Sequence, residues 1–246
     1  MYEIDAEKMS FSTLNELIRK TAQSDIVIHN CCGQRYIASG MSGKKITIHG
    51  IPGNALGAYL DGSTITVQGN VQDATGDTMN NGYLFIHGNA GDATGYAMRG
   101  GTICIQGNTG YRCGVHMKEY GNQIPKLLIG GKAGSFLGEY QAGGVIAVFN
   151  LTADLQRPSE EPAVGNFCGS GMHGGVMFIR GESFPSLPPQ VAVKKMYYQE
   201  LPALHPLLDI FCTVFPQTNR KLLETSVYSV LTPNTDNPYK QLYTNN

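Results

Sequence analysis

The sequence predicts an all-β protein, a right-handed single-stranded parallel β-helix of about eight coils, and three observations lead to this fold class. All 31 glycines lie between Gly33 and Gly181. Within that stretch glycines recur every 19 residues, and the strand-like runs KITIHG, TITVQG, YLFIHG and TICIQG share this period. A fixed period of this length is typical of a solenoid, in which each repeat buries its core against its neighbours. A right-handed path is expected because crossovers between parallel strands are nearly always right-handed.

Residues 1–24 contain no glycine and are expected to form an N-terminal helical cap. From Met9 to Ser24 apolar side chains recur at helical spacing, and Thr13 and Glu16 match the spacing of a capping box. The end of a solenoid exposes an apolar core and unpaired strand edges. We therefore expect this helix to lie over the first coil.

Residues 25–181 hold the repeats, and their strand-like runs align without gaps. Because side chains alternate between two faces along a strand, two aliphatic columns fall on one face of the predicted sheet. The first column is Ile26, Ile46, Ile65, Leu84, Ile103, Leu127, Ile146 and Met177, and the second is Ile28, Ile48, Val67, Ile86, Ile105, Ile129, Val148 and Ile179. These two columns are predicted to form the interior.

A second stretch of each repeat is built around a recurring glycine and is expected to turn the chain. Glycine reaches positive φ without steric cost, so this column marks a tight corner of the coil. Its members are Gly57, Gly76, Gly95, Gly114, Gly138 and Gly169. A nearby column of Met side chains is interpreted as core filling, and a recurring Asn column is interpreted as a structural ladder.

The outward-facing column of the strands changes character along the chain. It runs from Val27, Thr47 and Thr66 to Phe85, Cys104, Leu128, Ala147 and Phe178. An outer sheet face that is apolar has to be covered, either by the C-terminal part of this chain or by another protein. Phe85, Leu128 and Phe178 are the candidate residues for a partner-binding face.

Residues 182–246 are predicted to be a separate extension rich in proline and tyrosine. Eight of the 12 prolines lie there, and glycine is absent. A short helix is expected between Leu204 and Phe215, followed by an extended arm that is held against a surface. Two insertions, KEYGNQIP and LTADLQRPSEEPAV, interrupt the repeat and are candidates for contacts.

Composition excludes several classes of function. A net charge of −1 with 15% charged residues argues against nucleic-acid binding, which requires a basic surface. The N-terminal residues lack the charged-then-apolar pattern of an export signal, and no apolar run approaches the ~18 residues of a membrane span. We therefore expect a cytoplasmic protein that does not bind membranes.

Side chains that could carry chemistry do not converge in the aligned repeats, so no catalytic, cofactor-binding or metal-binding residue is assigned. The six cysteines contain no CxxC pair and are interpreted as reduced and structural. His29 and His49 stack in a polar column with Gln68, His87 and Gln106, but two histidines do not make a metal site. Asp73 and Asp92 also stack, and such a pair leaves open an autonomous β-helix enzyme or binder of polysaccharides.

Residues 69–117 and the run VGNFCGSGMHGGVMFIRG resemble the GXGXG domain at the C-terminal end of the glutamate synthase large subunit. The resemblance covers roughly residues 25–181 and includes the period, the paired glycines and the GMHGG run of the last coil. One of the subunits of formylmethanofuran dehydrogenase contains the same type of domain. Free-standing versions occur in split, archaeal-type glutamate synthases, and the tail PYKQLY is similar to theirs.

The resemblance implies a scaffold subunit without catalytic residues. In glutamate synthase the domain braces the glutamine amidotransferase domain against the FMN and iron–sulfur synthase domain. FMN and the iron–sulfur cluster would therefore reside on partner subunits, and no catalysis is expected of this chain alone. The alternative is a subunit of a one-carbon enzyme similar to formylmethanofuran dehydrogenase. Self-association into a homo-oligomer also stays open.

Overall fold

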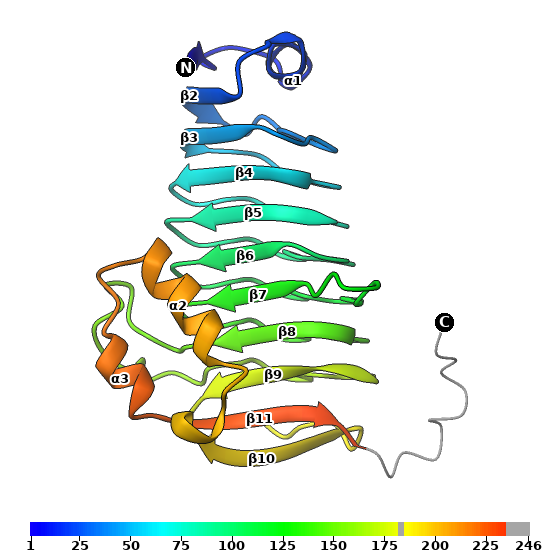
Figure 1. Cartoon of the computed structure of the whole chain (residues 1–246), viewed down its shortest axis with the longest axis vertical. Helices are drawn as coiled ribbons and strands as arrows, with labels where there is room; N and C mark the ends of the chain where they lie inside the picture. Colours follow the sequence, from blue (N-terminus) through cyan, green and yellow to red (C-terminus); the bar gives the residue numbers. More distant parts are fainter. Residues whose placement is uncertain (182–184, 235–246) are drawn as a thin grey trace.

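One mixed sheet of 11 strands runs the length of the molecule in the computed structural model, which describes residues 1–181 and 185–234 (Figure 1). The strand order is β1-β2-β3-β4-β5-β6-β7-β8-β9-β11-β10. The strands are β1 (Tyr2–Asp5), β2 (Asp25–Cys32), β3 (Lys45–Ile51), β4 (Asp61–Gln68), β5 (Asn81–Ile86), β6 (Thr102–Ile105), β7 (Lys126–Ile129), β8 (Ala142–Val148), β9 (Gly174–Arg180), β10 (Val191–Tyr197) and β11 (Val227–Pro233). The helices are α1 (Phe11–Lys20), the 3-10 helix η1 (Tyr198–Glu200), α2 (His205–Val214) and α3 (Arg220–Glu224).

Strands β2 to β9 pair in parallel, and each repeat contributes one strand. The register joins equivalent residues of successive repeats, for example Ile46 with Ile65 and Ile65 with Leu84. Both aliphatic columns predicted from the sequence lie in the interior, and every member is at most 1% exposed. The alignment of the repeats therefore predicted the pairing of these strands correctly.

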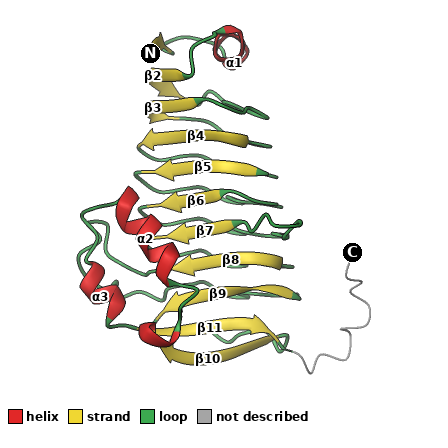
Figure 2. Ribbon diagram, in the orientation of Figure 1, coloured by secondary structure: helices red, strands yellow, loops and turns green. Residues whose placement is uncertain are grey.

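The predicted closed parallel β-helix was wrong as a fold class. The structure contains a single mixed sheet, in which β11 and β10 run antiparallel at one end. The second stretch of each repeat is not a strand: it returns along the chain as turns, drawn green in Figure 2, and joins its neighbours through isolated bridges such as Val71 with Ala90. Its backbone has positive φ at every second residue around the recurring glycine, and this alternation does not form the regular strand that a closing second sheet would require.

Two apolar cores lie on opposite faces of the sheet. The main core fills the space between the sheet and the return stretches, and it includes the two aliphatic columns together with Leu60, Met79, Met98, Met117 and Met172. The second core lies on the outer face of β6 to β9, beneath residues 198–226. The predicted role of the methionine column as core filling is confirmed.

The N-terminal segment closes one end of the sheet with one strand and one helix. β1 pairs in parallel with β2, an extra strand that the sequence did not predict. Helix α1 buries Leu14 and Ile18 against the main core, as expected for a covering helix. Its cap is Ser10 and not the predicted Thr13: the Ser10 hydroxyl accepts a hydrogen bond from the Thr13 N–H at 3.1 Å.

The C-terminal segment returns to the sheet and extends it. Strand β11 pairs with β9, and β10 pairs with β11 along its whole length. The short helix expected between Leu204 and Phe215 is α2. The PYKQLY tail lies outside the described residues, and the division at residues 24 and 181 stays a prediction because one sheet runs through all three parts. Across residues 1–181 and 185–234, no helix has the length and apolarity that crossing a membrane requires.

Candidate partner interface

The C-terminal segment covers the outer sheet face that the sequence predicted as a candidate partner-binding face. Residues 198–226, named the C-terminal cover, lie over β6 to β9 (Figure 1). Leu128 is fully buried and Phe178 is 3% exposed in this second core, whereas Phe85 is half-buried at its margin. The column predicted as a partner face is therefore covered by this chain, the other outcome that the sequence left open.

Aromatic and aliphatic side chains attach the C-terminal cover to the sheet. Phe211 packs against Phe149 with ring centroids 4.6 Å apart, and it also contacts Phe215 at 4.9 Å. The second insertion joins the same core: Leu155 is fully buried, and its carbonyl accepts a hydrogen bond from the Asn219 N–H at 3.0 Å. This insertion thus makes contacts within the chain.

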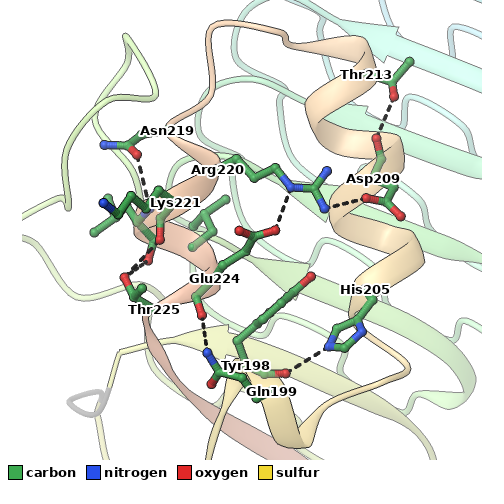
Figure 3. Close-up of polar contacts among 12 residues, drawn as sticks. Tyr198, Gln199, His205, Asp209, Thr213, Asn219, Arg220, Lys221, Glu224 and Thr225 are labelled. Atoms are coloured by element: carbon green, nitrogen blue, oxygen red, sulfur yellow. Dashed lines mark hydrogen bonds and ion pairs between the residues drawn. The ribbon is translucent and has the colours of Figure 1, made fainter.

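Polar contacts on the solvent side hold the two helices of the cover together (Figure 3). Arg220 bridges Asp209 and Glu224, both at 2.7 Å, and these two carboxylates raise the pKa of Arg220. Gln199 donates a hydrogen bond to the Glu224 carbonyl at 3.0 Å. The pairs are exposed, so each contributes about 1 kcal/mol or less and orients the cover rather than holding it on the sheet.

The predicted polar column of histidines and glutamines has two environments: its first members are partly or fully exposed, whereas His87 lies at the edge of the C-terminal cover. His29 and His49 stack at 5.2 Å on the uncovered part, and His29 lies 3.8 Å from Glu3. His87 instead meets the edge of Phe215 at 5.1 Å, and its burial lowers the pKa of the imidazole. In the described part of the chain, no group of three or more His, Cys, Asp or Glu side chains is arranged to hold a metal ion.

The stacked aspartates accept hydrogen bonds from the backbone of the following repeat. Asp73 Oδ1 accepts a hydrogen bond from the Asp92 N–H, and Asp92 Oδ1 accepts one from the Tyr111 N–H, both at 2.8 Å. Asn70 and Asn89 act in the same way, each accepting from the backbone of the next repeat at 2.8 Å. The asparagine column is therefore the structural ladder that the sequence predicted, and the aspartates form a second one beside it.

The cysteines are free thiols in the structure. Burial raises the pKa of Cys31 and Cys113 to about 11 and that of Cys168 to about 12, so these thiols stay protonated at neutral pH. A protonated thiol is a poor nucleophile and a poor metal ligand. Cys32 differs because it is exposed.

Each return stretch alternates positive and negative φ around the recurring glycine, and the five residues centred on it are named a glycine turn. The six predicted glycines have φ values between +61° and +71°. The residues two positions before and after each glycine also have positive φ, as at Ala74 and Thr78 around Gly76. Their N–H groups bond to the next repeat, whereas that of Gly76 donates to Leu56 of the previous one at 2.8 Å.

Bulky side chains occupy these flanking positions in the later repeats and gather on the surface. Phe136 stacks on Phe167 at 4.9 Å, and the Arg112 guanidinium lies 5.3 Å from the Phe136 ring centroid. In the neighbouring column His116 stacks on Tyr140 at 5.2 Å. Phe167 is 53% exposed and Tyr140 is 45% exposed. These five residues are named the aromatic patch.

The aromatic patch combines backbone strain with solvent exposure. A left-handed conformation costs a residue with a side chain roughly 1–2 kcal/mol, and all five patch residues adopt it. The equivalent position before the glycine is Ala55, Ala74 and Ala93 in the earlier repeats. Large aromatic groups on strained and exposed backbone are poorly explained by stability alone, whereas they suit a surface that contacts another macromolecule.

The constant glycine of each turn gives no sign of this patch, because the patch residues lie two positions before and after that glycine. Positions two residues before and two residues after each glycine hold Ala, Tyr, Thr, Arg, His and Phe, so neither column contains a constant residue type. In the last repeat Gly169 and Gly171 do show the alternation, within Phe167 to Gly171. That pair of glycines was the one available signal.

This alternation connects the geometry with known proteins, because the GXGXG motif places glycine at every second residue. The match to the GXGXG motif covers residues 8–224. The chain belongs to the GXGXG motif family. In the last repeat Phe167, Gly169 and Gly171 have positive φ at every second residue, and a Cβ added at the central glycine of the turns would lie against core side chains, as at Gly76.

Two further comparisons place this member of the GXGXG motif family among known proteins. It is 41% identical over 251 residues to an uncharacterised protein of Methanocaldococcus jannaschii, covering 98% of this chain and 95% of that one. Its structure is similar to a chain of the formyltransferase/hydrolase complex of Methylorubrum extorquens, solved in complex with methylofuran. That similarity has a TM-score of 0.64 and 20% identity, and it covers 92% of this chain and 89% of the other. It establishes a shared fold.

Proposed function

We propose that this protein is a non-catalytic structural subunit of a multi-subunit enzyme and that it binds a partner subunit through the aromatic patch. The patch itself is the main support, because it exposes stacked aromatic rings on strained backbone. Interfaces are enriched in aromatic residues and arginine, and the patch consists of such residues and one histidine.

The use of polar side chains elsewhere supports the structural part of this proposal. Asp73, Asp92 and the asparagine ladder bind the backbone of neighbouring repeats. Burial keeps the thiols of Cys104, Cys113 and Cys168 in their protonated form by raising their pKa. These groups maintain the repeat, and the chemistry would then belong to partner subunits.

The shared fold favours a one-carbon enzyme as the multi-subunit assembly to which this protein belongs. The chain of the formyltransferase/hydrolase complex shares most of its length with this protein, and that complex is itself built from several subunits. We therefore propose a formyl-transferring or formyl-hydrolysing complex as the first candidate. In this setting the protein would act in the cytoplasm as a brace between catalytic subunits.

A glutamate-synthase-like assembly is the second candidate, supported by the resemblance of the repeats and by membership of the GXGXG motif family. Its partners would be a glutamine amidotransferase subunit and a synthase subunit that carries FMN and an iron–sulfur cluster. The two candidate assemblies differ in their partner subunits and in the cofactors of those subunits. Identifying the chains that co-purify with this protein therefore distinguishes them.

Affinity purification of the tagged chain from its native host, followed by mass spectrometry, tests the proposal. We expect stoichiometric partner chains of the formyltransferase or hydrolase type. Recovery of an amidotransferase together with a partner chain that shows the absorption spectrum of a flavin would favour the second candidate. Recovery of the chain alone under low-salt conditions would contradict a role as a subunit.

A further inference from the structure

We propose that the N-terminal end of the molecule contains a binding site for a small oxyanion, a carboxylate or a phosphate group, centred on Arg35. A hollow of about 370 Å³ opens there between α1 and the first repeats, and it is lined by Arg35, Asn54, Gln72, Cys32 and Phe11 among others. Its volume falls in the range of small-molecule sites, which is about 300–1,000 Å³. This site is independent of the proposed partner interface.

The charge of the hollow favours an anion. Arg35 is its one charged lining residue, and no carboxylate of the described residues pairs with this guanidinium. The guanidinium instead lies 4.6 Å from the ring centroid of Phe11 and 5.9 Å from that of Tyr36. These contacts with aromatic rings leave the guanidinium N–H groups without a carboxylate partner, and a guanidinium N–H edge matches the oxygens of carboxylate and phosphate.

Buried polar contacts hold the walls of the hollow in place. Gln34 is 7% exposed, and its amide donates to the carbonyls of Ala6 and Met9 at 2.9 Å and 3.1 Å. The Gln34 carbonyl oxygen accepts from the Cys32 N–H at 2.7 Å. The Asn15 amide donates to the Arg35 carbonyl at 3.0 Å and so ties α1 to the same loop. The loop that carries Arg35 is therefore fixed from both sides.

Uncharged polar groups and an aromatic ring complete the site. Asn54 and Gln72, whose side-chain amides contain both N–H donors and a carbonyl acceptor, line the wall formed by the next repeats, and Phe11 lies beside the guanidinium. A second hollow shares Phe11 in its lining and is also lined by Arg19, Lys20 and Glu16, the last two of which form an ion pair at 2.5 Å. A ligand that joins an anionic group to a flat apolar group suits this arrangement.

Isothermal titration of the full chain with benzoate, phenyl phosphate and benzyl alcohol tests the site. The first two probes share a ring and differ in the anion, so they separate a carboxylate site from a phosphate site, and the alcohol removes the charge. We expect saturable binding of at least one anion, and Arg35→Gln should weaken it about tenfold or more. Arg157→Gln removes the same charge from an exposed loop residue and should leave the affinity unchanged.

Two further readouts decide the outcome if Arg35→Gln alters the fold. Gln72→Glu places a carboxylate in the wall and should also weaken anion binding about tenfold. Bound anion should slow alkylation of the exposed Cys32 thiol by iodoacetamide, measured on the Cys32 peptide by mass spectrometry. The proposal is overturned if neither anion binds more tightly than benzyl alcohol, or if Arg157→Gln and Arg35→Gln weaken binding equally.

Discussion

Ala74 and Ala58 lie in the glycine turns of successive repeats but differ in the sign of φ. Ala74 adopts φ +56°, whereas Ala58 lies between positive-φ residues and has no positive φ of its own. Glycine removes the steric penalty of the left-handed region, which is roughly 1–2 kcal/mol, but it increases the entropy of the unfolded chain by an amount worth roughly 0.5–1 kcal/mol. The same substitution should therefore change stability in opposite directions at the two sites.

We predict that Ala74→Gly raises the free energy of unfolding by up to about 1 kcal/mol, because relief of strain exceeds the entropic loss. Ala58→Gly, the matched control, should lower it by about 1 kcal/mol. Urea denaturation of the two variants measures both values. Equal losses of stability in the two variants would contradict the assignment of strain.

The recurring glycines are required for packing as well as for φ. A Cβ on Gly76 would lie 2.5 Å from Ile103 Cδ1 and 3.1 Å from Leu84 Cδ1, inside the main core. Gly43 has a similar φ of +67°, but a Cβ there would meet no atom within 4 Å. Comparing the two sites separates backbone strain from overpacking.

Gly76→Ala should lower the free energy of unfolding by about 3 kcal/mol, the sum of strain and overpacking. Gly43→Ala should cost only the strain, about 1–2 kcal/mol. Thermal and urea unfolding of both variants provide the test. A loss at Gly76 no larger than at Gly43 would show that the core absorbs the added methyl group.

At the scale of elements, α2 was predicted from its apolar residues, whereas β10 and β11 were not. The tail that begins with the run VYSVLTP is rich in tyrosine and proline, which predicts an extended arm held against a surface. In the structure the same run is β11, which pairs with β9 and places Tyr228 and Leu231 in the cores. The local pattern predicted an extended backbone but contained no information about its partner strand.

The C-terminal cover should be held on the sheet by apolar burial. We predict that Leu208→Ala lowers the free energy of unfolding by about 2–5 kcal/mol, because Leu208 is fully buried in the second core. Thr213→Ala on the exposed side of the same helix should change it by less than about 0.5 kcal/mol. Limited proteolysis should also cleave the cover faster in the Leu208 variant alone. Equal effects of the two substitutions would contradict this arrangement.

His87 should make the attachment of the cover sensitive to pH. Burial against Phe215 lowers the pKa of His87, so the unfolded chain binds the proton more readily than the folded one. Its contribution to stability is present above the unfolded pKa of about 6.5 and is lost as pH falls through that value toward the lowered folded pKa.

His87→Gln should therefore reduce the loss of stability seen between about pH 6.5 and pH 5. Urea unfolding at several pH values gives the slope for each protein. An unchanged slope in the His87 variant would rule out this source of pH dependence.

At the scale of the whole molecule, the period predicted the stacking of the repeats but not the shape that they enclose. Both aliphatic columns fall in the interior at the predicted register. The sequence could not distinguish a second strand from a glycine turn, because the flanking positive-φ residues include Arg112, Phe136 and Tyr140, types that rarely adopt this conformation. The apolar outer column was predicted from the sequence, but the C-terminal cover lies more than a hundred residues from Phe85 in sequence, and only the folded chain shows that the two meet.

The central claim is that the aromatic patch binds a partner subunit, and recovery of that subunit with tagged variants tests it most directly. Phe136→Asp combined with Phe167→Asp should reduce the recovered partner about tenfold or more, because buried aromatic residues dominate interface energies. The protein should remain folded, since both sites are on the surface and Asp tolerates positive φ. The matched control combines Tyr120→Asp with Ile124→Asp, residues that are 72% and 44% exposed on the first insertion, and should recover the partner as the wild type does. Undiminished recovery with the folded Phe136 and Phe167 double variant would contradict the claim.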